Sequence, residues 1–375
     1  MELSIVMPCL NEADTIAACV GKALRSLAAL GVEGEVIVAD NGSTDGSPEL
    51  AAAAGARVVP VPARGYGSAL MGGIEAAHGR FILMGDADDS YDFAAIEPFL
   101  AKLRDGWELV QGCRLPAGGG RVLPGAMPPL HRWVGNPLFT ALARWWFGSP
   151  VHDTNCGLRA FTKDLYRRLD QRCTGMEFAN EMLIKASLAH VRIAEVPITL
   201  HRDGRKAHRP HLRTFRDGWR TLRFYLLYCP RWLFLVPGLG LMLLGLAGYA
   251  LAWQARPGTV LIVLASLLLL CGYQSVLFAF LTKAFAINEG LLPMNRRMAT
   301  FFRMMTLERG LVAGALALLL GVVGLVVAWL DLPGNAGVEP GEMLKLAIPA
   351  ATLATLGFQT VLFSFFASLL GMHRR

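Results

Sequence analysis

The sequence lacks several patterns that would place it in other classes of protein. Its seven cysteines are an odd number, lie scattered and form no C-x-x-C pair, so we predict reduced thiols, neither a disulfide framework nor a zinc site. No basic leader accompanies the first strand-like run, Met1–Met7, and we therefore expect no secretory signal and a first domain that stays in the cytoplasm. Charged residues make up only 17% of the chain, and four long stretches after Arg231 contain none.

The four uncharged stretches are each long enough to cross a bilayer, which takes about 20 apolar residues. They are Trp232–Ala255, Pro257–Thr282, Gly310–Leu330 and Leu346–Met372. Buried helices of a soluble protein are the alternative interpretation, but four such runs in succession favour membrane spans. We therefore predict an all-α membrane domain of four transmembrane helices over residues 231–375.

The membrane half also repeats itself. Gly272–Phe280 (G-Y-Q-S-V-L-F-A-F) matches Gly357–Phe365 (G-F-Q-T-V-L-F-S-F), and an L-G-x-x-G-x-x-x-x-W pattern occurs at 244–253 and again at 320–329. Two related helix hairpins are implied, in which small residues and one glutamine per hairpin allow packing and hydrogen bonding in lipid. A transport pathway is the alternative, which the absence of ionisable groups inside the spans disfavours.

The loops between the spans indicate orientation. Basic residues fill the loop between the second and third spans and the end of the chain: Lys283, Arg296, Arg297, Arg303, Arg309, Arg374 and Arg375. The loop after the third span carries Asp331, Glu339 and Glu342 against Lys345. By the positive-inside rule, we expect an integral protein of the cell inner membrane with its catalytic domain and both termini in the cytoplasm.

In the first half, short β-branched runs alternate with helical patterns, which predicts an α/β domain over residues 1–207 with a mostly parallel sheet covered by helices. The expected strands are Leu3–Met7, Glu35–Asp40, Arg57–Val61 and Phe81–Asp86, and the expected helices are Asp14–Leu30, Pro48–Ala54, Ser68–His78 and Phe93–Arg104. Ser47 is expected to be the N-cap before Pro48. Ligands of such sheets lie beyond the carboxyl ends of the strands, so residues 8–12, 40–45 and 86–89 should converge on one crevice.

The residues of these three loops suit a nucleoside diphosphate. A carboxylate at a strand end can hydrogen-bond a base and ribose hydroxyls, and the D-x-D turn Asp86-Ala87-Asp88 places two carboxylates where a divalent cation bridges them to a diphosphate. Turn chemistry is the alternative, because Asn, Asp, Gly and Ser also cap strands and helices. For Asn41-Gly42-Ser43 alone both interpretations stay open, whereas three such loops together favour function.

Positive charge gathers between His201 and Arg231, where nine basic and two acidic residues leave a surplus equal to the net +7 of the whole chain. Phosphates of nucleic acid or of a lipid surface are both candidate partners, and the span that begins at Trp232 favours lipid over nucleic acid. Within residues 208–230, arginines and apolar residues share a helical period, which predicts an amphipathic helix on the membrane surface. The preceding loop, Arg202–Lys206, brings three cations around Gly204 that can close over a lipid phosphate.

Six motifs occur in order between Val6 and Lys206: V-M-P-C-L-N-E, V-A-D-N-G-S-T-D-G, R-G-Y-G-S-A-L, G-D-A-D-D-S-Y-D-F, D-T-N-C-G-L-R-A-F and H-R-D-G-R-K. Over about residues 3–229 the sequence thereby resembles glycosyltransferase family 2, and within it the dolichol-phosphate-mannose-synthase-like group that makes polyprenyl-phosphate sugars. The resemblance implies a GT-A-type fold, a divalent cation (Mg²⁺ or Mn²⁺), and inverting transfer of one sugar from a UDP- or GDP-sugar to polyprenyl phosphate.

The resemblance also implies roles for individual residues. The nucleoside pocket would be lined by Pro8, Asn11, Glu12 and Asp40; the nucleotide and metal would be held by Asp86 and Asp88; and phosphates would be met by Arg114, Arg159, Arg202 and Lys206. No general base is needed, because a phosphate monoester is already anionic at neutral pH. The catalytic set is therefore expected to be Asp88, Arg159, Arg202 and Lys206.

Several alternatives remain at this point. Asp153 and Arg159 can instead form a buried salt bridge, and Glu177 and Glu181, on one helix face, can either favour a helix N-terminus or lie near the sugar. A processive polysaccharide synthase shares the donor motifs, but such proteins usually carry Q-x-x-R-W, which this sequence lacks. A non-enzymatic lipid-scaffold or flippase component is the third candidate, and a homo-oligomer is compatible with all three.

Overall fold

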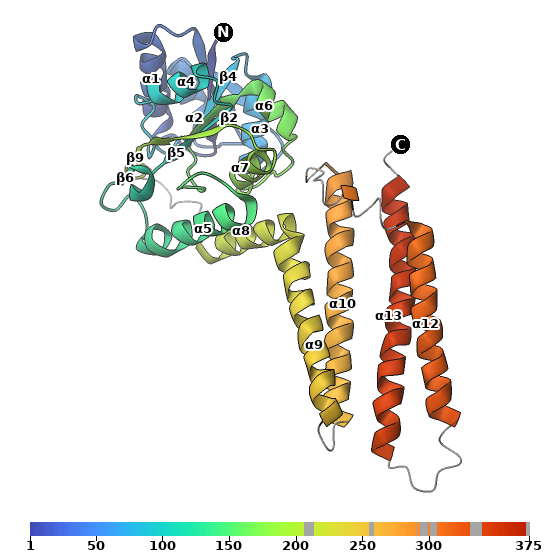
Figure 1. The fold of residues 1–375 in the computed structure, drawn as a ribbon. Helices are drawn as coiled ribbons and strands as arrows, with labels where there is room; N and C mark the ends of the chain where they lie inside the picture. Colours follow the sequence, from blue (N-terminus) through green and yellow to red (C-terminus); the bar gives the residue numbers. More distant parts are fainter. Residues whose placement is uncertain are drawn as a thin grey trace. The chain divides into compact units, whose positions relative to one another are not determined.

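The structure, a computed structural model, describes residues 1–205, 214–254, 259–290, 292, 299–300, 306–330 and 340–372 (Figure 1). By its internal contacts the chain divides into two units, Met1–Tyr225 and Leu226–Arg375. The boundary falls inside α8, Thr214–Tyr228, whose sequence is the basic amphipathic segment.

The first unit is built on a seven-stranded sheet of order β3-β2-β1-β4-β7-β5-β8. The strands are β1 Leu3–Cys9, β2 Gly34–Asp40, β3 Arg57–Pro60, β4 Phe81–Met84, β5 Leu109–Cys113, β7 Arg159–Thr162 and β8 Ile193–Pro197. Strand β7 runs antiparallel to β4 and β5, and the other neighbours pair in parallel. A second, two-stranded sheet joins β6, Arg121–Val122, to β9, Thr199–Leu200. The α/β, GT-A-type, mostly parallel core is confirmed.

Strand β1 shows why the sheet is buried on both faces. It is a nearly continuous apolar run, as expected for a central parallel strand. Successive side chains point to opposite faces, so Ile5 joins the hydrophobic cluster that includes α1, Ile16–Ala29, and Val6 joins the cluster that includes α3, Tyr66–Ala76. Helices therefore cover both faces, and the polar residues that follow the strands remain at the edge of the sheet.

The expected strands and helices of residues 1–104 are present, with two corrections. Helix α4 is Glu97–Arg104, shorter than expected, because Phe93 is fully buried in the core in a non-helical segment and Pro98 lies in the first helical turn. Helix α2, Ser47–Ala53, begins at Ser47, so the N-cap is Gly46 with φ 87° and the expected N-cap at Ser47 is wrong. The remaining helices of the unit are α5 Asn136–Phe147, α6 Lys163–Leu169 and α7 Phe178–Leu188.

Within its described residues, the second unit has four helices that are long and apolar enough to cross a membrane, as expected. They are α9 Val236–Gln254, which follows the short η3 Arg231–Leu235, α10 Thr259–Asn288, α12 Leu307–Leu330 and α13 Pro340–Met372. Figure 1 shows α9 beside α10 and α12 beside α13. The described part of the chain therefore includes an all-α membrane region of two hairpins.

Glycine contacts support the internal repeat. A Cβ placed on Gly245 would lie 2.8 Å from the carbonyl oxygen of Ala265, and one on Gly321 would lie 2.7 Å from that of Ala350. Gly272 likewise faces the backbone of α9, as Gly357 faces the backbone of α12. Equivalent positions of the two repeats thus make equivalent close helix contacts, which only a residue without a side chain permits.

Candidate active site

The three polar loops meet at the carboxyl ends of β1, β2 and β4. The backbone N–H of Asn11 donates to Ser43 Oγ at 2.9 Å, and the Asn11 side-chain oxygen accepts from the backbone N–H of Thr44 at 2.8 Å. The backbone N–H of Glu12 donates to Ser47 Oγ at 2.8 Å. Asn11 adopts φ 59°, a left-handed conformation that asparagine tolerates better than most residues. The expected convergence of these loops is therefore present.

The loop after β2 is also a tightly hydrogen-bonded turn. The carboxylate of Asp40 accepts from the backbone N–H groups of Gly42 and Ser43 at 3.1 and 3.2 Å. The Asn41 amide donates to the carbonyl groups of Val61 and Ala63 and accepts from Gly65. Turn chemistry thus accounts for Asn41, while Asp40 stays at the end of its strand, opposite Cys9 of β1; half-buried Pro8 is opposite Ala39.

The D-A-D turn directly follows β4. Asp88 accepts from the backbone N–H and the hydroxyl of Ser90, at 3.1 and 2.6 Å, and Asp86 accepts from the hydroxyl of Tyr66 at 2.9 Å. Burial, and next the charge of Asp88, raise the pKa of Asp86 to about 6. Gly157 lies against this carboxylate, since a Cβ there would be 2.8 Å from Asp86 Oδ2. Two neighbouring carboxylates therefore share a partly buried site, and position 157 beside it has no room for a side chain.

The chemistry of this turn suits a divalent cation. Carboxylate oxygens are the ligands that Mg²⁺ and Mn²⁺ prefer, and a cation between Asp86 and Asp88 would offset the repulsion that raises the Asp86 pKa. Within the described ranges, no group of three His, Cys, Asp or Glu side chains could hold a metal ion. Mg²⁺ commonly binds through one or two carboxylates together with substrate phosphates and water, so a two-carboxylate site fits a cation that arrives with a diphosphate.

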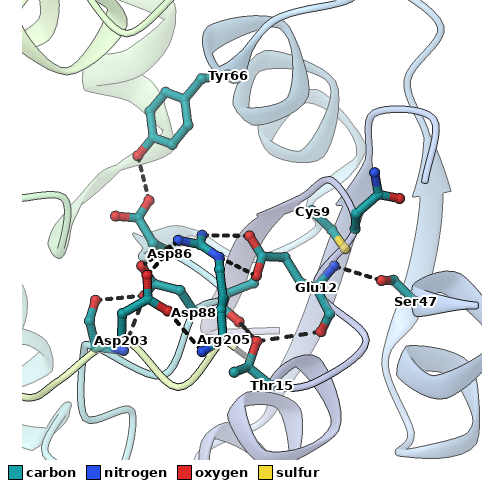
Figure 2. Close-up of polar contacts among 12 residues, drawn as sticks. Cys9, Glu12, Thr15, Ser47, Tyr66, Asp86, Asp88, Asp203 and Arg205 are labelled. Carbon is teal, nitrogen blue, oxygen red and sulfur yellow. Dashed lines mark hydrogen bonds and ion pairs between the residues drawn. The ribbon is translucent and has the colours of Figure 1, made fainter. Parts of the chain in front are cut away.

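Arg205 contacts carboxylates of two of the loops, Glu12 after β1 and Asp88 after β4 (Figure 2). Its Nε and Nη2 donate to the two carboxylate oxygens of Glu12 at 2.7 and 2.5 Å, and Nη1 donates to Asp203 at 2.9 Å. The same Nη1 lies 3.4 Å from Asp88 Oδ2. Glu12 is buried and Arg205 is half-buried, so the guanidinium neutralises a carboxylate charge that is largely removed from water.

Residues 201–205, which we name the strap, are attached to the D-A-D turn through the backbone. The N–H of His201 donates to the carbonyl of Ser90, and the N–H of Gly204 donates to the carbonyl of Asp88, both at 2.9 Å. Gly204 also approaches helix α1 closely, because a Cβ there would lie 2.9 Å from Thr15 Cγ2. These contacts hold the strap on the D-A-D turn, and none of them involves the Arg205 side chain.

The three described members of the expected phosphate-binding set, Arg114, Arg159 and Arg202, have different partners. Arg114 makes a bidentate pair with buried Asp153, Nε to Oδ2 at 2.7 Å and Nη2 to Oδ1 at 2.9 Å. The alternative salt bridge between Asp153 and Arg159 is wrong, because Arg114 is the partner. Arg159 is fully buried, donates to the carbonyl groups of Cys156 and Ala179, and keeps an Nε without a hydrogen-bond partner. Burial lowers the pKa of Arg159.

Arg202 contacts the loop after β6. Its Nε donates to the carbonyl of Pro124 at 2.6 Å, and its side chain is exposed. It lines a cavity of about 450 Å³ whose other lining residues are Lys22, Asp89, Leu123, Pro124 and His201. Lys206 lies outside the described residues.

Other residues have roles that the sequence did not assign. Tyr66, inside the R-G-Y-G-S-A-L motif, holds Asp86, and the hydroxyl of Tyr91 accepts from the backbone N–H of Gly157 at 2.8 Å. Glu181 is fully buried, pairs with Lys185 at 2.8 Å and accepts from the backbone N–H groups of Arg172 and Cys173. Its carboxylate thus stabilises a loop rather than facing a sugar.

The cysteines behave as expected for reduced thiols. All seven are free, and burial raises the pKa of Cys9 to about 11 and of Cys19 to about 12. Both thiols are next to the site but stay protonated at neutral pH, so they supply no nucleophile.

A GT-A-type sheet with carboxylates at the ends of β1 and β4, joined to a membrane region, defines a membrane glycosyltransferase. Residues 4–170 match the family model "Glycosyl transferase family 2", and residues 280–371 match "Glycosyltransferase family 2 C-terminal transmembrane region". The chain is 38% identical to the low-salt glycan biosynthesis hexosyltransferase Agl6 of Haloferax volcanii over 98% of this chain and 89% of that protein. The chain therefore belongs to glycosyltransferase family 2.

Further similarities cover part of the chain. A dolichyl-phosphate hexose transferase of Haloferax volcanii is 33% identical over 52% of this chain and 82% of its own length. Among solved structures, glucosyl-3-phosphoglycerate synthase from Mycobacterium tuberculosis in complex with Mn²⁺, UDP and glucosyl-3-phosphoglycerate is 26% identical and covers 60% of this chain and 77% of that chain, with a TM-score of 0.45.

Proposed function

We propose that this glycosyltransferase transfers a single hexose from a UDP- or GDP-sugar to polyprenyl phosphate, with inversion at the anomeric carbon. The observation that carries the donor half is the carboxylate pair Asp86 and Asp88, which shares one end of the sheet with Glu12 and the Arg205 guanidinium. The similarity to the hexosyltransferase of Haloferax volcanii, which extends over 98% of this chain, supports a hexose donor.

The acceptor half rests on charge and on the membrane region. A polyprenyl phosphate combines a lipid chain with an anionic head, and this chain combines four apolar helices with a basic segment that directly precedes them. The relative named dolichyl-phosphate hexose transferase supports the same class of acceptor. Arg202 and Lys206 are the proposed contacts of the acceptor phosphate, and the cavity beside Arg202 offers the space for a head group.

Exposed aromatic side chains further support contact with lipid. Trp133, just before α5, is 69% exposed, Trp145 in α5 is 65% exposed, and Trp219 in α8 is 60% exposed. Tryptophan is favoured at the boundary between water and hydrocarbon. Arg132 lies over the Trp133 ring at 5.0 Å, a pairing of cation and aromatic group that suits anionic head groups. We propose that these residues lie at the membrane surface, on the cytoplasmic side of the cell inner membrane.

The proposed chemistry asks the protein mainly to position its substrates. The acceptor phosphate is already anionic, so it can attack the anomeric carbon without a general base, and in-line attack inverts the configuration. Asp86 and Asp88 are the residues that would hold the divalent cation, which supplies charge stabilisation for the departing nucleoside diphosphate. Tyr66 keeps Asp86 oriented, and Ser90 keeps Asp88 oriented.

The test is transfer by the purified full chain in lipid. The protein is incubated with labelled UDP- and GDP-sugars, Mg²⁺ or Mn²⁺, and polyprenyl phosphate, and the lipid product is analysed by mass and by NMR of the anomeric proton. We expect one sugar per lipid phosphate, with the anomeric configuration opposite to that of the donor.

Other products would exclude the proposal. A polymer of many sugars would indicate the processive synthase, and retained configuration would exclude inversion. Absence of transfer from every donor, with movement of polyprenyl phosphate or its sugar derivative between leaflets, would indicate the flippase component instead.

A further inference from the structure

Arg205 lies among three carboxylates. It contacts Glu12 and Asp203 at hydrogen-bond distance, and its Nη1 lies 3.4 Å from Asp88 Oδ2. The Arg205 guanidinium thus connects Glu12, which the sequence assigns to the nucleoside pocket, with Asp88, which the sequence assigns to the metal, as Figure 2 shows. No role for Arg205 follows from the transfer reaction as proposed.

We infer that Arg205 makes the donor site select the anionic complex of divalent cation and nucleoside diphosphate over the free cation. This inference rests on the proposed function. A guanidinium beside Asp88 repels a lone divalent cation, because like charges in a partly buried site interact more strongly than in water. The negative charge of a nucleoside diphosphate neutralises both the divalent cation and the Arg205 guanidinium, so the complex binds where the free ion does not.

The distances around Arg205 indicate which of its contacts is replaced when a diphosphate binds. The two bonds to Glu12 are short, 2.7 and 2.5 Å, and bidentate, whereas the contact with Asp88 is longer at 3.4 Å. Bidentate pairs of arginine and carboxylate are the stronger kind. Glu12 and Asp203 therefore hold the guanidinium in the site, and the longer contact of Nη1 with Asp88 is the one that an oxygen of the incoming diphosphate replaces. Arg205 thus acts as a positioning and specificity residue.

The strap does not have to unfold when Arg205 exchanges its contact with Asp88 for one with the diphosphate. The backbone bonds of His201 to Ser90 and of Gly204 to Asp88 do not involve the Arg205 side chain. Exchange of the Asp88 contact for a phosphate contact therefore leaves the backbone bonds between the D-A-D turn and the strap in place.

The experiment measures two affinities of the full chain in lipid nanodiscs. Binding of Mn²⁺ alone is followed by the electron paramagnetic resonance signal of the free ion, and binding of UDP and GDP at saturating Mg²⁺ is followed by calorimetry. For Arg205→Gln, we expect Mn²⁺ alone to bind more tightly by at least about 10-fold, since the repelling charge is gone, and the preferred nucleotide to bind more weakly by a similar factor. Arg205→Lys keeps the charge and should leave the Mn²⁺ affinity near that of the wild type.

Arg104→Gln is the matched control. Arg104 forms the same kind of bidentate pair, Nε and Nη2 to the two oxygens of Glu2 at 2.7 and 2.8 Å, and Glu2 precedes β1 at the opposite end of the sheet. This variant should change neither affinity.

The two changes expected for Arg205→Gln have opposite signs, which separates the inference from a simple loss of structure. Weaker binding of both ligands, or an unchanged Mn²⁺ affinity in a variant that still binds nucleotide, would overturn the inference and leave the proposed function standing. A wild-type protein that binds neither UDP nor GDP with Mg²⁺ would overturn the donor-site assignment, and the inference with it.

Discussion

The ammonium group of Lys22 lies 2.7 Å from a carboxylate oxygen of Asp89, the residue that follows Asp88 and adopts φ 61°. A left-handed conformation is unfavourable for most side chains, so the turn needs contacts that hold it. The hydrogen bond to Asp89 raises the pKa of Lys22, which keeps the amine charged. Lys22 in α1 thus helps to position the D-A-D turn from outside it.

We expect Lys22→Met to reduce sugar transfer by about 10-fold, because Asp89 loses its counter-ion and Asp88 loses its fixed position. The pair is partly exposed, so the free energy of unfolding should fall by less than about 1 kcal/mol. Steady-state transfer and thermal unfolding are measured together. Arg25→Met, an exposed position one turn later in α1, is the control and should match the wild type. Equal transfer rates of Lys22→Met and Arg25→Met would show that Lys22 does not position the D-A-D turn for transfer.

Asp88→Ala tests the divalent cation. Without this carboxylate the cation loses a ligand, and we expect transfer to fall by at least about 100-fold while the protein still folds, since a loop at a strand end contributes little to the core. Transfer by the wild-type protein should disappear in excess chelator and return with Mg²⁺ or Mn²⁺. Glu97→Ala removes an exposed carboxylate at the start of α4 and should have no effect. Full activity of Asp88→Ala in chelator would contradict the metal assignment.

Arg202→Lys and Arg216→Lys separate acceptor binding from attachment to the membrane. A phosphate clamp depends on the planar geometry of the guanidinium, whereas attraction to an anionic surface depends on charge alone. We expect Arg202→Lys to lower transfer markedly at saturating donor, with all the protein still in the membrane fraction. Arg216, exposed on α8, should tolerate lysine in both assays. Equal and mild effects of the two substitutions would exclude the strap from the acceptor site.

Arg114 and Asp153 form a buried pair, so Asp153→Asn should leave a buried charge without its partner. We expect the free energy of unfolding to fall by about 3–5 kcal/mol, the usual effect of removing one member of such a pair. Denaturant unfolding, followed by fluorescence, measures the change. If stability instead stays constant while the affinity for nucleotide drops, Arg114 contacts phosphate, as the family resemblance implies.

Single cysteines test the orientation of the membrane region. With four spans and basic loops inside, a cysteine at Asn335 should react with an impermeant thiol reagent added outside intact cells, and one at Asn295 should react only after the cells are opened. Both positions lie outside the described residues, so the prediction rests on the charges of the loops. The reverse labelling pattern would place the catalytic unit on the other side of the membrane.

Patterns that are local in the sequence were sufficient for much of the fold. The four spans could be predicted because membrane crossing depends on length and apolar content within one segment. The D-A-D turn could be assigned because it directly follows a buried strand, β4, at the end of the sheet where ligands bind. The glycine pattern of the two hairpins was likewise visible as a repeat, and its contacts in the structure are equivalent.

Helix α5 shows one limit of local patterns. Its sequence, N-P-L-F-T-A-L-A-R-W-W-F, contains apolar residues on more than one face. The structure shows that Phe139 and Phe147 enclose Tyr225 from α8, with ring centroids 5.9 and 5.5 Å apart, while Trp145 is exposed. Which apolar face is buried depends on a helix that lies about 80 positions later in the sequence, so no local period could indicate it.

The partners of the charged residues were decided only by the tertiary structure. Asp153 is six positions before Arg159, yet it pairs with Arg114, the residue directly after β5, because the pairing of β5 with β7 brings these two segments together. Glu12 and Arg205 are 193 positions apart and meet only after the strap has bonded to the D-A-D turn. The sequence by itself determined which carboxylates and cations are available near the strand ends. The choice among their possible pairings was left to the packed sheet, because electrostatic attraction decreases with distance and only the fold sets the distances.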